Sequence, residues 1–291
     1  MDFQLLTPSD WQDYELIDCG HGEKLERFGR FILRRPEPQA VWSYGLPKAE
    51  WERYDARYLP DGSHSGNWER KGKMPDQWYV KYQHGEMKLK FRLGLTGFKH
   101  VGIFPEQASN WQYIYQHSRR IRDAKVLNLF AYTGGASLAA RAGGANVIHC
   151  DSIKNVVSWA NTNMQSSNLK DIRWLVEDAF KFVQREAKRG RTYNGIILDP
   201  PAYGHGPKGE RWQIEEMIDE LMQGVAKILD PKRRFLVLNS YSLGFSPLVL
   251  QNLVHTHLGA DTAQKAERGE LYMPDKAGRR LPMGIFIRLA E

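Results

Sequence analysis

An aspartate, two prolines and a nearby tyrosine form the pattern in this 291-residue sequence that points most directly to chemistry. They are Asp199, Pro200, Pro201 and Tyr203, and they follow an apolar run, 195–198, that is typical of a buried strand. Two consecutive prolines end a strand and restrict its backbone, so they would fix the directions of the Asp199 carboxylate and the Pro200 carbonyl. Both groups accept hydrogen bonds and could hold an amino group or a ring N–H while Tyr203 stacks on a planar substrate. The alternative is a purely structural turn.

A pair of glycines, Gly134 and Gly135, follows another apolar run at 126–131. Glycine lets the backbone approach a ligand closely and open a helix whose free N–H groups face that ligand. The spacing differs from the Gly-x-Gly-x-x-Gly pattern of dinucleotide-binding proteins, which argues against a dehydrogenase. The alternative for the pair is a tight connection between a strand and a helix.

Two carboxylates follow the next two strand-like runs. Asp151 ends the run 147–150 and could accept hydrogen bonds from both hydroxyls of an adenosine ribose. Asp178 comes shortly after the run 172–176 and could accept a hydrogen bond from the adenine amine. For each of them the alternative is a helix N-cap, which is compatible with the binding role.

Apolar runs of strand length alternate with amphipathic stretches of helix length from residue 125 onward. The expected strands are 126–131, 147–150, 172–176, 195–198 and 235–238, and the expected helices are 135–141, 153–165, 179–188 and 214–229. Such alternation implies a mainly parallel sheet with helices on both faces, an α/β fold of Rossmann-like architecture. The last runs, 270–273 and 285–289, have no helix between them, so we expect an antiparallel closing pair, which is more typical of class I methyltransferases than of dehydrogenases.

The first hundred residues are rich in short strand-like runs and turn residues, such as Asp18-Cys19-Gly20. We therefore expect a small β-rich N-terminal domain, residues 1–97, with a role in substrate or RNA recognition or as a lid, and a catalytic domain, residues 98–291. Trp42, Trp51 and Trp68 could stack on bases in that smaller domain. The alternative is that their rings belong to the core.

At this point the chain resembles a known family, the bacterial class I S-adenosylmethionine-dependent methyltransferases related to the large-subunit ribosomal RNA cytosine-5 and guanine-7 enzymes. The resemblance rests on the segment 96–107, the glycine loop, Asp151, Asp178 and the Asp-Pro-Pro segment. It implies S-adenosylmethionine as cofactor and a set of residues that contact it. These are Phe104, Gln107, Phe130, Ala131, Tyr132, Thr133, Gly134, Gly135, Asp151 and Asp178.

One departure from that family concerns cysteine. Cytosine-5 methyltransferases use a thiolate to activate the pyrimidine, and in relatives it lies in the Pro-Pro loop or after the fifth strand. The chain has two cysteines, Cys19 and Cys150, and neither is at those positions. We therefore expect methylation of a nitrogen atom, with Asp199 and Pro200 orienting the acceptor.

The charge balance permits a polyanionic partner without requiring one: 41 Lys and Arg against 34 Asp and Glu give a net charge of +7. Basic residues gather at 181–191 and 232–234, where the alternative is solvated surface. We expect no metal site, no signal peptide and no membrane span, and hence a soluble cytoplasmic protein.

Three hypotheses about function follow. The leading one is methylation of a base nitrogen of RNA, in particular ribosomal RNA. The second keeps the cofactor but replaces RNA with a small planar molecule or a protein amide. The third is a non-catalytic, cofactor-binding RNA module, against which the intact Asp199–Tyr203 segment argues.

Overall fold

The first of the expected parallel strands, β9 (Lys125–Leu129), lies inside an eight-stranded sheet. Its neighbours are β12 (Gly195–Leu198) and β10 (Asn146–Asp151), and both are parallel to it. Beyond them lie β15 (Phe235–Ser240) and β11 (Ile172–Val176), again parallel. From β9 in the middle of this sheet the chain adds β10 and β11 on one side and then β12 and β15 on the other, so that strand order reverses next to β9.

The structure is a computed structural model that describes residues 3–62, 65–241 and 244–291. The chain forms two compact units. One unit comprises Met1–Leu6, Gln107–Leu271 and Met283–Glu291, and the other comprises Thr7–Glu106 and Tyr272–Pro282. The functional boundary expected between residues 97 and 98 stays a prediction.

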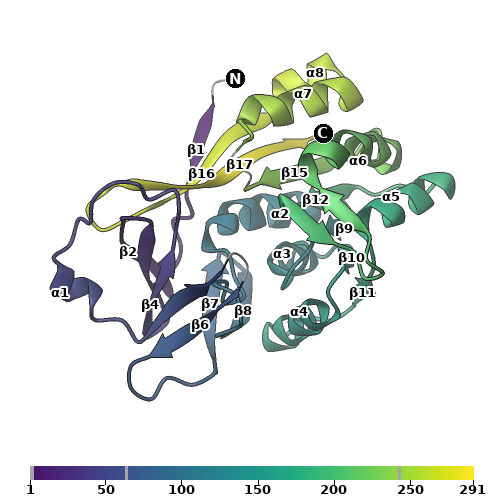
Figure 1. Cartoon of the computed structure of the whole chain (residues 1–291). Helices are drawn as coiled ribbons and strands as arrows, with labels where there is room; N and C mark the ends of the chain where they lie inside the picture. Colours follow the sequence, from purple (N-terminus) through teal and green to yellow (C-terminus); the bar gives the residue numbers. More distant parts are fainter. Residues whose placement is uncertain (1–2, 63–64, 242–243) are drawn as a thin grey trace. The chain divides into compact units, whose positions relative to one another are not determined.

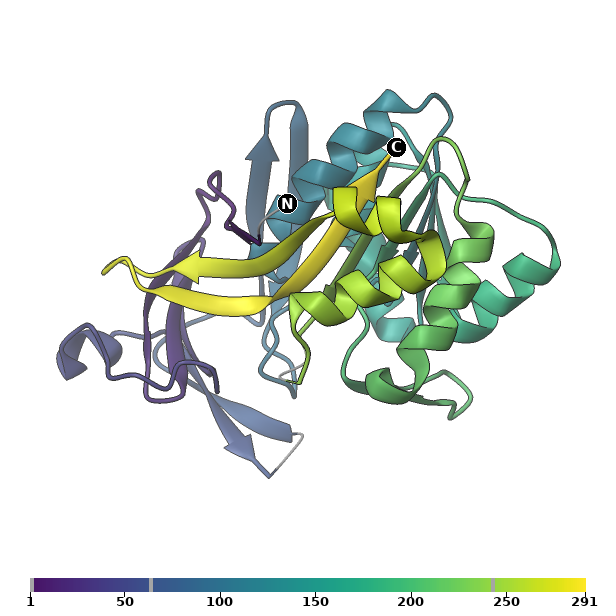
Figure 2. The ribbon, with the colours of Figure 1, turned by 90° about the horizontal axis from the view of Figure 1, so that it is seen from above.

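Helices cover both faces of the sheet in the first unit (Figure 1). On one face lie α2 (Ala108–Arg120), α3 (Gly135–Ala142) and α4 (Lys154–Ser166). The opposite face, visible from above in Figure 2, carries α5 (Ala179–Lys188), α6 (Ile214–Ile228), α7 (Pro247–Leu258) and α8 (Ala260–Lys265). Their apolar residues share a buried cluster with Leu127, Leu198 and Leu238, side chains that the strands direct to this face.

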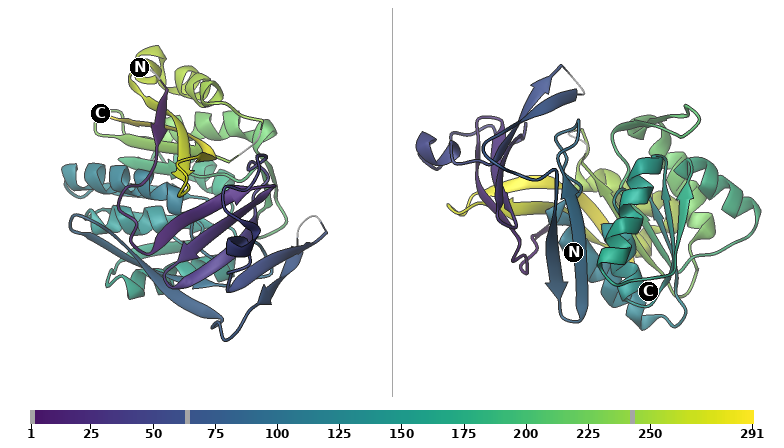
Figure 3. Two further views of the ribbon diagram at one scale, coloured as in Figure 1. Left: turned by 90° about the vertical axis from the view of Figure 1, so that its left-hand side faces the viewer. Right: turned by 90° about the horizontal axis from the view of Figure 1, so that it is seen from below.

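Three strands complete the sheet beyond β15. β17 (Arg280–Ala290) pairs antiparallel with β15, β16 (Glu267–Pro274) lies beside β17, and β1 (Gln4–Leu6) is parallel to β16 (Figure 3). Both long strands exceed the predicted runs. A parallel α/β sheet with an antiparallel closing strand and a β-rich N-terminal region confirms the predicted fold class. The sequence patterns did not reveal α2, α7, α8 or the short hairpin β13 (Tyr203–His205) and β14 (Arg211–Gln213).

The second unit is built from a mixed five-stranded sheet, an antiparallel hairpin and a short helix, α1 (Lys48–Trp51). A five-stranded sheet has the order β2 (Tyr14–Gly20), β3 (Glu23–Phe28), β4 (Phe31–Pro36), β5 (Ala56–Asp61) and β6 (Ser65–Arg70), in which only the contact of β4 with β5 is parallel. A separate hairpin joins β7 (Gln77–His84) to β8 (Met87–Gly94). A 3-10 turn (Pro105–Gln107) leads out of this unit into α2.

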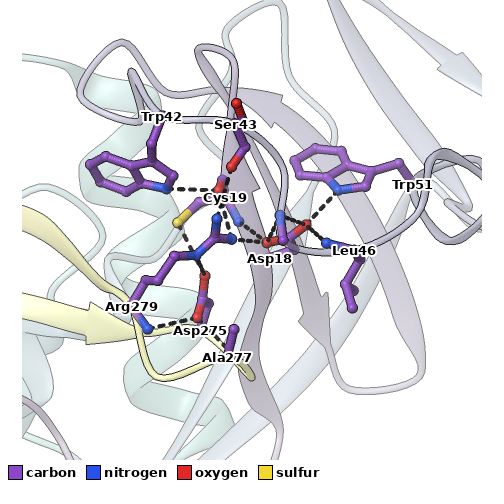
Figure 4. Close-up of polar contacts among 10 residues, drawn as sticks. Asp18, Cys19, Trp42, Ser43, Leu46, Trp51, Asp275, Ala277 and Arg279 are labelled. Atoms are coloured by element: carbon purple, nitrogen blue, oxygen red, sulfur yellow. Dashed lines mark hydrogen bonds and ion pairs between the residues drawn. The ribbon is translucent and has the colours of Figure 1, made fainter.

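The turn expected at Asp18-Cys19-Gly20 is wrong, because β2 continues through these residues and Asp18 is 1% exposed. A buried carboxylate must be paired, and Asp18 has several partners (Figure 4). Arg279 donates to Asp18 and also to Asp275, at 2.7 Å, and Trp51 donates its indole N–H at 2.6 Å. The backbone N–H of Leu46 donates to the same carboxylate at 2.8 Å. This network holds the loop between β16 and β17 on β2 within the second unit.

The three tryptophans that were candidates for base stacking have structural roles. Trp51 is completely buried. Trp42 and Trp68 are partly buried and donate their indole N–H groups to backbone carbonyls, of Cys19 at 2.9 Å and of Thr96 at 2.8 Å. Within the described residues, none of the helices is both long and apolar enough to span a membrane.

Candidate active site

The glycine loop leaves β9 through a series of left-handed backbone conformations. Phe130, Tyr132 and Gly134 have φ of 54°, 49° and 92°. Such angles are unfavourable for residues other than glycine and persist only where the surroundings hold them. The N–H of Ala131 donates to the Cys150 carbonyl at 3.2 Å, and this hydrogen bond joins the loop at the carboxyl end of β9 to the neighbouring strand β10.

Neighbouring side chains hold the rest of this loop. The carbonyl of Thr133 accepts from the Asn163 amide at 2.9 Å, and the Phe130 ring packs on Trp212 with ring centroids 4.8 Å apart. A Cβ on Gly135 would lie 2.5 Å from the Trp111 ring, so this glycine is required for close packing of α2. The two glycines therefore serve different purposes: Gly134 adopts a left-handed conformation and Gly135 admits an indole.

Asp151 ends β10 beside this loop. Its carboxylate accepts hydrogen bonds from the backbone N–H groups of Tyr132, at 2.8 Å, and of Ile153, at 3.0 Å. Burial raises the pKa of Asp151, against the lowering effect of these N–H donors. The side chain is only partly buried, so lone pairs remain for two ribose hydroxyls.

Asp178 is the N-cap of α5 and accepts from the Lys181 N–H at 2.8 Å, which is the alternative that the sequence left open. Two exposed apolar residues that sequence reasoning missed follow Asp151 and precede Asp178 along the chain, and one of them, Val176, is the register partner of Asp151. Ile153 is 55% exposed and Val176, the last residue of β11, is 42% exposed. Exposed apolar side chains beside polar groups are suited to the faces of a flat ring such as adenine.

Asp199 follows β12 directly, next to the glycine loop. It is partly buried and has no hydrogen bond or ion pair with any described residue. Burial raises the pKa of Asp199 to about 6. Pro200 is buried, and its carbonyl likewise has no partner within the described ranges. The two acceptors are thus available together, as the sequence pattern predicts.

The remaining residues of this segment are held by the β13–β14 hairpin. The Pro201 carbonyl accepts from the Trp212 indole at 2.7 Å, so it is not available to a ligand. Tyr203 is 55% exposed, and its hydroxyl lies 3.1 Å from Nε2 of His205. The ring of Tyr203 is therefore accessible for stacking on a planar substrate.

Gln107 precedes α2 and accepts from the Asn110 amide at 3.0 Å, which leaves its own Nε2 group without a partner among the described residues. A free amide N–H is suited to a carboxylate such as that of the cofactor's methionine part. Phe104 belongs to the other compact unit, where its ring packs on His100. Its contact with the cofactor stays a prediction.

Both cysteines are buried and free. The Cys150 thiol donates to the Glu177 carbonyl at 3.6 Å, and burial raises its pKa well above the usual range. Burial raises the pKa of Cys19 to about 12. Neither thiol can supply a thiolate beside Asp199, in agreement with the argument from sequence against cytosine-5 chemistry.

Other charged features do not form a second site. A surface hollow of about 640 Å³ lies at the amino ends of the strands, lined by Lys125, Arg173 and Arg191 among others, opposite the edge where ligands of α/β sheets bind. The basic stretch 181–191 is largely neutralised by carboxylates, as in the pairs Lys181–Glu210, at 2.7 Å, and Arg189–Glu186, at 3.1 Å. In the part of the chain that the structure describes, no three potential metal ligands are grouped.

Comparisons with known proteins agree with this geometry. The family model described as S-adenosylmethionine-dependent methyltransferase matches residues 42–250. An S-adenosylmethionine-dependent methyltransferase from Agrobacterium tumefaciens has a TM-score of 0.90 at 36% identity, over 99% of this chain and 93% of that one. A putative methyltransferase from Streptococcus mutans has a TM-score of 0.72 at 16% identity, over 97% of this chain and 76% of that one, and shows the fold alone.

Among curated proteins, the ribosomal RNA large subunit methyltransferase K/L of Shewanella frigidimarina is 28% identical over 159 residues, 53% of this chain and 22% of that protein. The chain thus spans about a fifth of the length of the curated relatives that it matches.

The sheet topology and the series of acceptors at its strand ends define a class I methyltransferase. The chain belongs to the S-adenosylmethionine-dependent methyltransferase family, and S-adenosylmethionine is its cofactor, as predicted. The residues present fit that cofactor, because Asp151 retains free lone pairs, Gln107 has a free amide N–H, and Ile153 and Val176 expose apolar surface between two carboxylates.

Proposed function

We propose that this protein methylates a base nitrogen of RNA, in particular ribosomal RNA, in the cytoplasm. The single observation that carries the proposal is the Asp199 carboxylate, which is partly buried and has no partner among the described residues. Burying a carboxylate without a partner costs stability, so such a group is suited to a ligand that donates a hydrogen bond.

The chemistry follows from the arrangement of acceptors. When bound, S-adenosylmethionine supplies an activated methyl group on a positively charged sulfur. Asp199 and the Pro200 carbonyl accept hydrogen bonds from an amino group or a ring N–H, and thereby fix the direction of the nitrogen lone pair. Holding two reactants in line can supply most of the rate acceleration for such a transfer. With a pKa of about 6, Asp199 is ionised at pH 7 and is a strong acceptor.

RNA as substrate is supported by three observations. The curated relatives carry the name ribosomal RNA large subunit methyltransferase. The net charge is +7, which favours a polyanionic partner. The exposed Tyr203 ring beside the acceptors is suited to stacking on an unpaired base, which is the usual way in which proteins read single-stranded RNA.

The test is methyl transfer from tritium-labelled S-adenosylmethionine to total RNA from cells that lack the gene, followed by nucleoside mass spectrometry. We expect a labelled nucleoside with the methyl group on nitrogen. Asp199→Ala should lose this activity and still bind S-adenosylhomocysteine. Label confined to small molecules or protein, or a methyl group on C5 of cytosine, would contradict the proposal.

A further inference from the structure

Two buried asparagines contact each other near the carboxyl end of β15. Asn239 is in β15 and is 3% exposed, and Asn110 is the third residue of α2 and is 1% exposed. The Asn110 amide nitrogen donates to the Asn239 oxygen at 2.9 Å and to the Gln107 oxygen at 3.0 Å. Because a buried amide needs hydrogen bonds, this chain of three amides couples the orientations of its members.

The orientation leaves one specific group of Asn239 unused. Its oxygen is held by Asn110, whereas its Nδ2 group donates to none of the described residues. Turning the Asn239 amide over would place its nitrogen against the Asn110 nitrogen, donor against donor. Asn110 cannot turn over by itself either, because its oxygen would then face the Gln107 and Asn239 oxygens.

The arrangement has a cost that packing alone does not explain. The Asn110 oxygen is buried without any hydrogen-bond partner. A fold that leaves an acceptor unsatisfied gains nothing from it in stability. What the arrangement does achieve is to keep both N–H groups of Asn110 on the neighbouring oxygens, and so to keep the Nδ2 group of Asn239 available.

Strand register places this donor beside the catalytic acceptor. Leu198 of β12 and Leu238 of β15 are partners in parallel strands, and both face the cluster beneath α5 to α7. The residues that follow them are Asp199, directly after β12, and Asn239, the last residue but one of β15. They therefore lie on neighbouring strands about 4.8 Å apart and face the opposite side, where Asn110 lies. An unpartnered acceptor and an unpartnered donor thus lie side by side.

We propose that Asn239 is a substrate-binding residue that works with Asp199, and that Asn110 is its positioning residue. Asp199 accepts an N–H of the methyl acceptor, and Asn239 donates to an acceptor atom next to it. This selects a base edge on which an N–H lies beside an oxygen or ring nitrogen, as on the Watson–Crick edge. It excludes N7 of guanine, because N7 and O6 on that edge are both acceptors.

Two consequences follow for the substrate. The methylated nitrogen carries hydrogen before the reaction, so it is an exocyclic amine or a ring N–H. As its bond to the methyl carbon forms and the methyl–sulfur bond breaks, that nitrogen loses a proton to the Asp199 carboxylate. The base is also unpaired when bound, since a Watson–Crick edge is otherwise occupied by its partner base. The inference rests on the proposed function and makes it more specific.

The experiment uses the full chain at pH 8, labelled S-adenosylmethionine, and lysate from cells that lack the gene, separated into RNA and non-RNA fractions. We expect the label in RNA, on an amino nitrogen or on a ring nitrogen that carried hydrogen before the reaction. The strand should not be cleaved at this nucleotide by borohydride and aniline. 7-Methylguanosine, which that treatment cleaves, or 1-methyladenosine would overturn the inference and leave the proposed function intact. Label only in the non-RNA fraction would contradict the proposed function. If the labelled molecule in that fraction also had no N–H beside a hydrogen-bond acceptor atom, the inference would be contradicted as well. No label in any fraction would count against both.

Variants separate a positioning role from a structural one. Asn239→Ala should lower kcat/KM about 100-fold, as expected for a lost hydrogen bond to substrate. Asn110→Ala frees Asn239 to rotate and should cost less, about tenfold through loss of orientation. Asn110→Asp replaces the donor by an acceptor of the same shape and holds Asn239 the wrong way round, so it should cost more than the alanine variant, again about 100-fold.

The decisive readout is kcat/KM of the folded fraction, because a merely structural Asn110 would lower the melting temperature of both variants and leave the activity of their folded fraction unchanged. Binding of S-adenosylhomocysteine should be unchanged in Asn239→Ala and weaker in both Asn110 variants, which also release Gln107, so activities are compared at saturating cofactor and the melting temperature of each variant is recorded. Asn146→Asp, at an exposed residue that begins β10 on the opposite edge of the sheet, is the matched control and should behave like wild type. Equal losses for the two Asn110 variants, or a larger loss for alanine, would overturn the positioning role.

Discussion

Arg279 donates a hydrogen bond to Asp18 although 261 positions separate the two residues. Within the second compact unit this pair joins the loop between β16 and β17 to strand β2 (Figure 4). Asp18 is 1% exposed, so its charge depends on Arg279 and on the N–H donors around it. The C-terminal loop is thus a structural part of the unit that the N-terminal residues form.

Arg279→Met should therefore destabilise the protein. Removing one partner of a buried ion pair leaves an uncompensated charge, and we expect a loss of about 3 kcal/mol in the free energy of unfolding. Urea unfolding followed by tryptophan fluorescence measures it. In the control Arg53→Met, whose partner Glu50 is exposed, we expect a loss below about 0.5 kcal/mol. Similar losses for the two variants would show that the Asp18 network is not needed for stability.

Gly135→Ala should disturb the cofactor loop through α2. The new Cβ would lie 2.5 Å from Cζ2 of Trp111, and neither the indole nor the loop backbone can yield easily. Overpacking of this kind costs about 1–3 kcal/mol, and we expect weaker binding of S-adenosylhomocysteine by calorimetry. Gly244→Ala, with no atom near the added Cβ, is the matched control.

The smaller ring of Trp111→Phe should partly restore binding to Gly135→Ala. The single variant Trp111→Phe serves as reference for the double variant. If the loss of binding in the double variant equals the sum of the losses in the two single variants, the glycine and the indole act independently.

Asp151→Asn should weaken the cofactor complex. The carboxylate accepts backbone N–H groups of Tyr132 and Ile153 on separate oxygens, and an amide can accept on only one side. We expect affinity for S-adenosylhomocysteine to fall about 10- to 100-fold, the range for a lost hydrogen bond to a charged group. Asp171→Asn, just before β11 at the opposite edge of the sheet, should leave affinity unchanged. An unchanged affinity in Asp151→Asn would remove Asp151 from the site.

Sequence patterns could predict the parallel strands and the residues that end them. Each strand leaves a local signal, an apolar run followed by Gly, Asp or Pro, and parallel strands bring their carboxyl ends to one edge of the sheet. This is why local patterns alone suffice to select Asp151 and Asp199 as neighbours of one ligand. Their roles as cofactor and acceptor contacts stay predictions.

Contacts between distant segments could not be predicted in the same way. Nothing in the local sequence indicates that Asn110 will bind Asn239, because their distance depends on how α2 packs on the sheet. For Gly135 the local pattern indicates only that the backbone approaches a ligand. The packing of Trp111 on this glycine could not be predicted, because Trp111 lies 24 positions earlier in a helix that the patterns missed. Asp-Cys-Gly is typical of turns, so the local pattern predicts the wrong structure at Asp18. A buried aspartate is tolerable in this strand because the distant residues Arg279 and Trp51 donate to it.

Activity should fall as the pH is lowered through about 6. Burial raises the pKa of Asp199 to about 6, and the protonated carboxyl no longer offers two free acceptor oxygens. The pH profile of kcat/KM should therefore show a midpoint near this value. Asp199→Asn should be slower and should lose this midpoint. A midpoint near 4 in the wild type would contradict the burial of the carboxylate.

The same shift makes a prediction for stability. Because the folded-state pKa lies above the usual value of 3.8, the folded protein binds this proton more tightly than the unfolded chain does. Ionisation of Asp199 therefore lowers stability as pH rises from about 4 to beyond 6. Asp199→Asn should raise the melting temperature at pH 7 and leave it nearly unchanged at pH 4, measured by calorimetry in the absence of ligand. A lower melting temperature at pH 7 would show that the carboxylate has a stabilising partner.

A chain without cysteine should remain an active methyltransferase. Cys150 is fully buried with a raised pKa, and Cys19 lies in the other unit with a pKa raised to about 12, so neither forms a thiolate at pH 7. We expect the double variant Cys19→Ser, Cys150→Ala to retain kcat within about threefold and to lose about 1 kcal/mol of stability from the small cavity at Cys150. The assay is label transfer to RNA, with the melting temperature as control for folding. A folded double variant without activity would reinstate a covalent thiolate mechanism and remove the argument for nitrogen as the methylated atom.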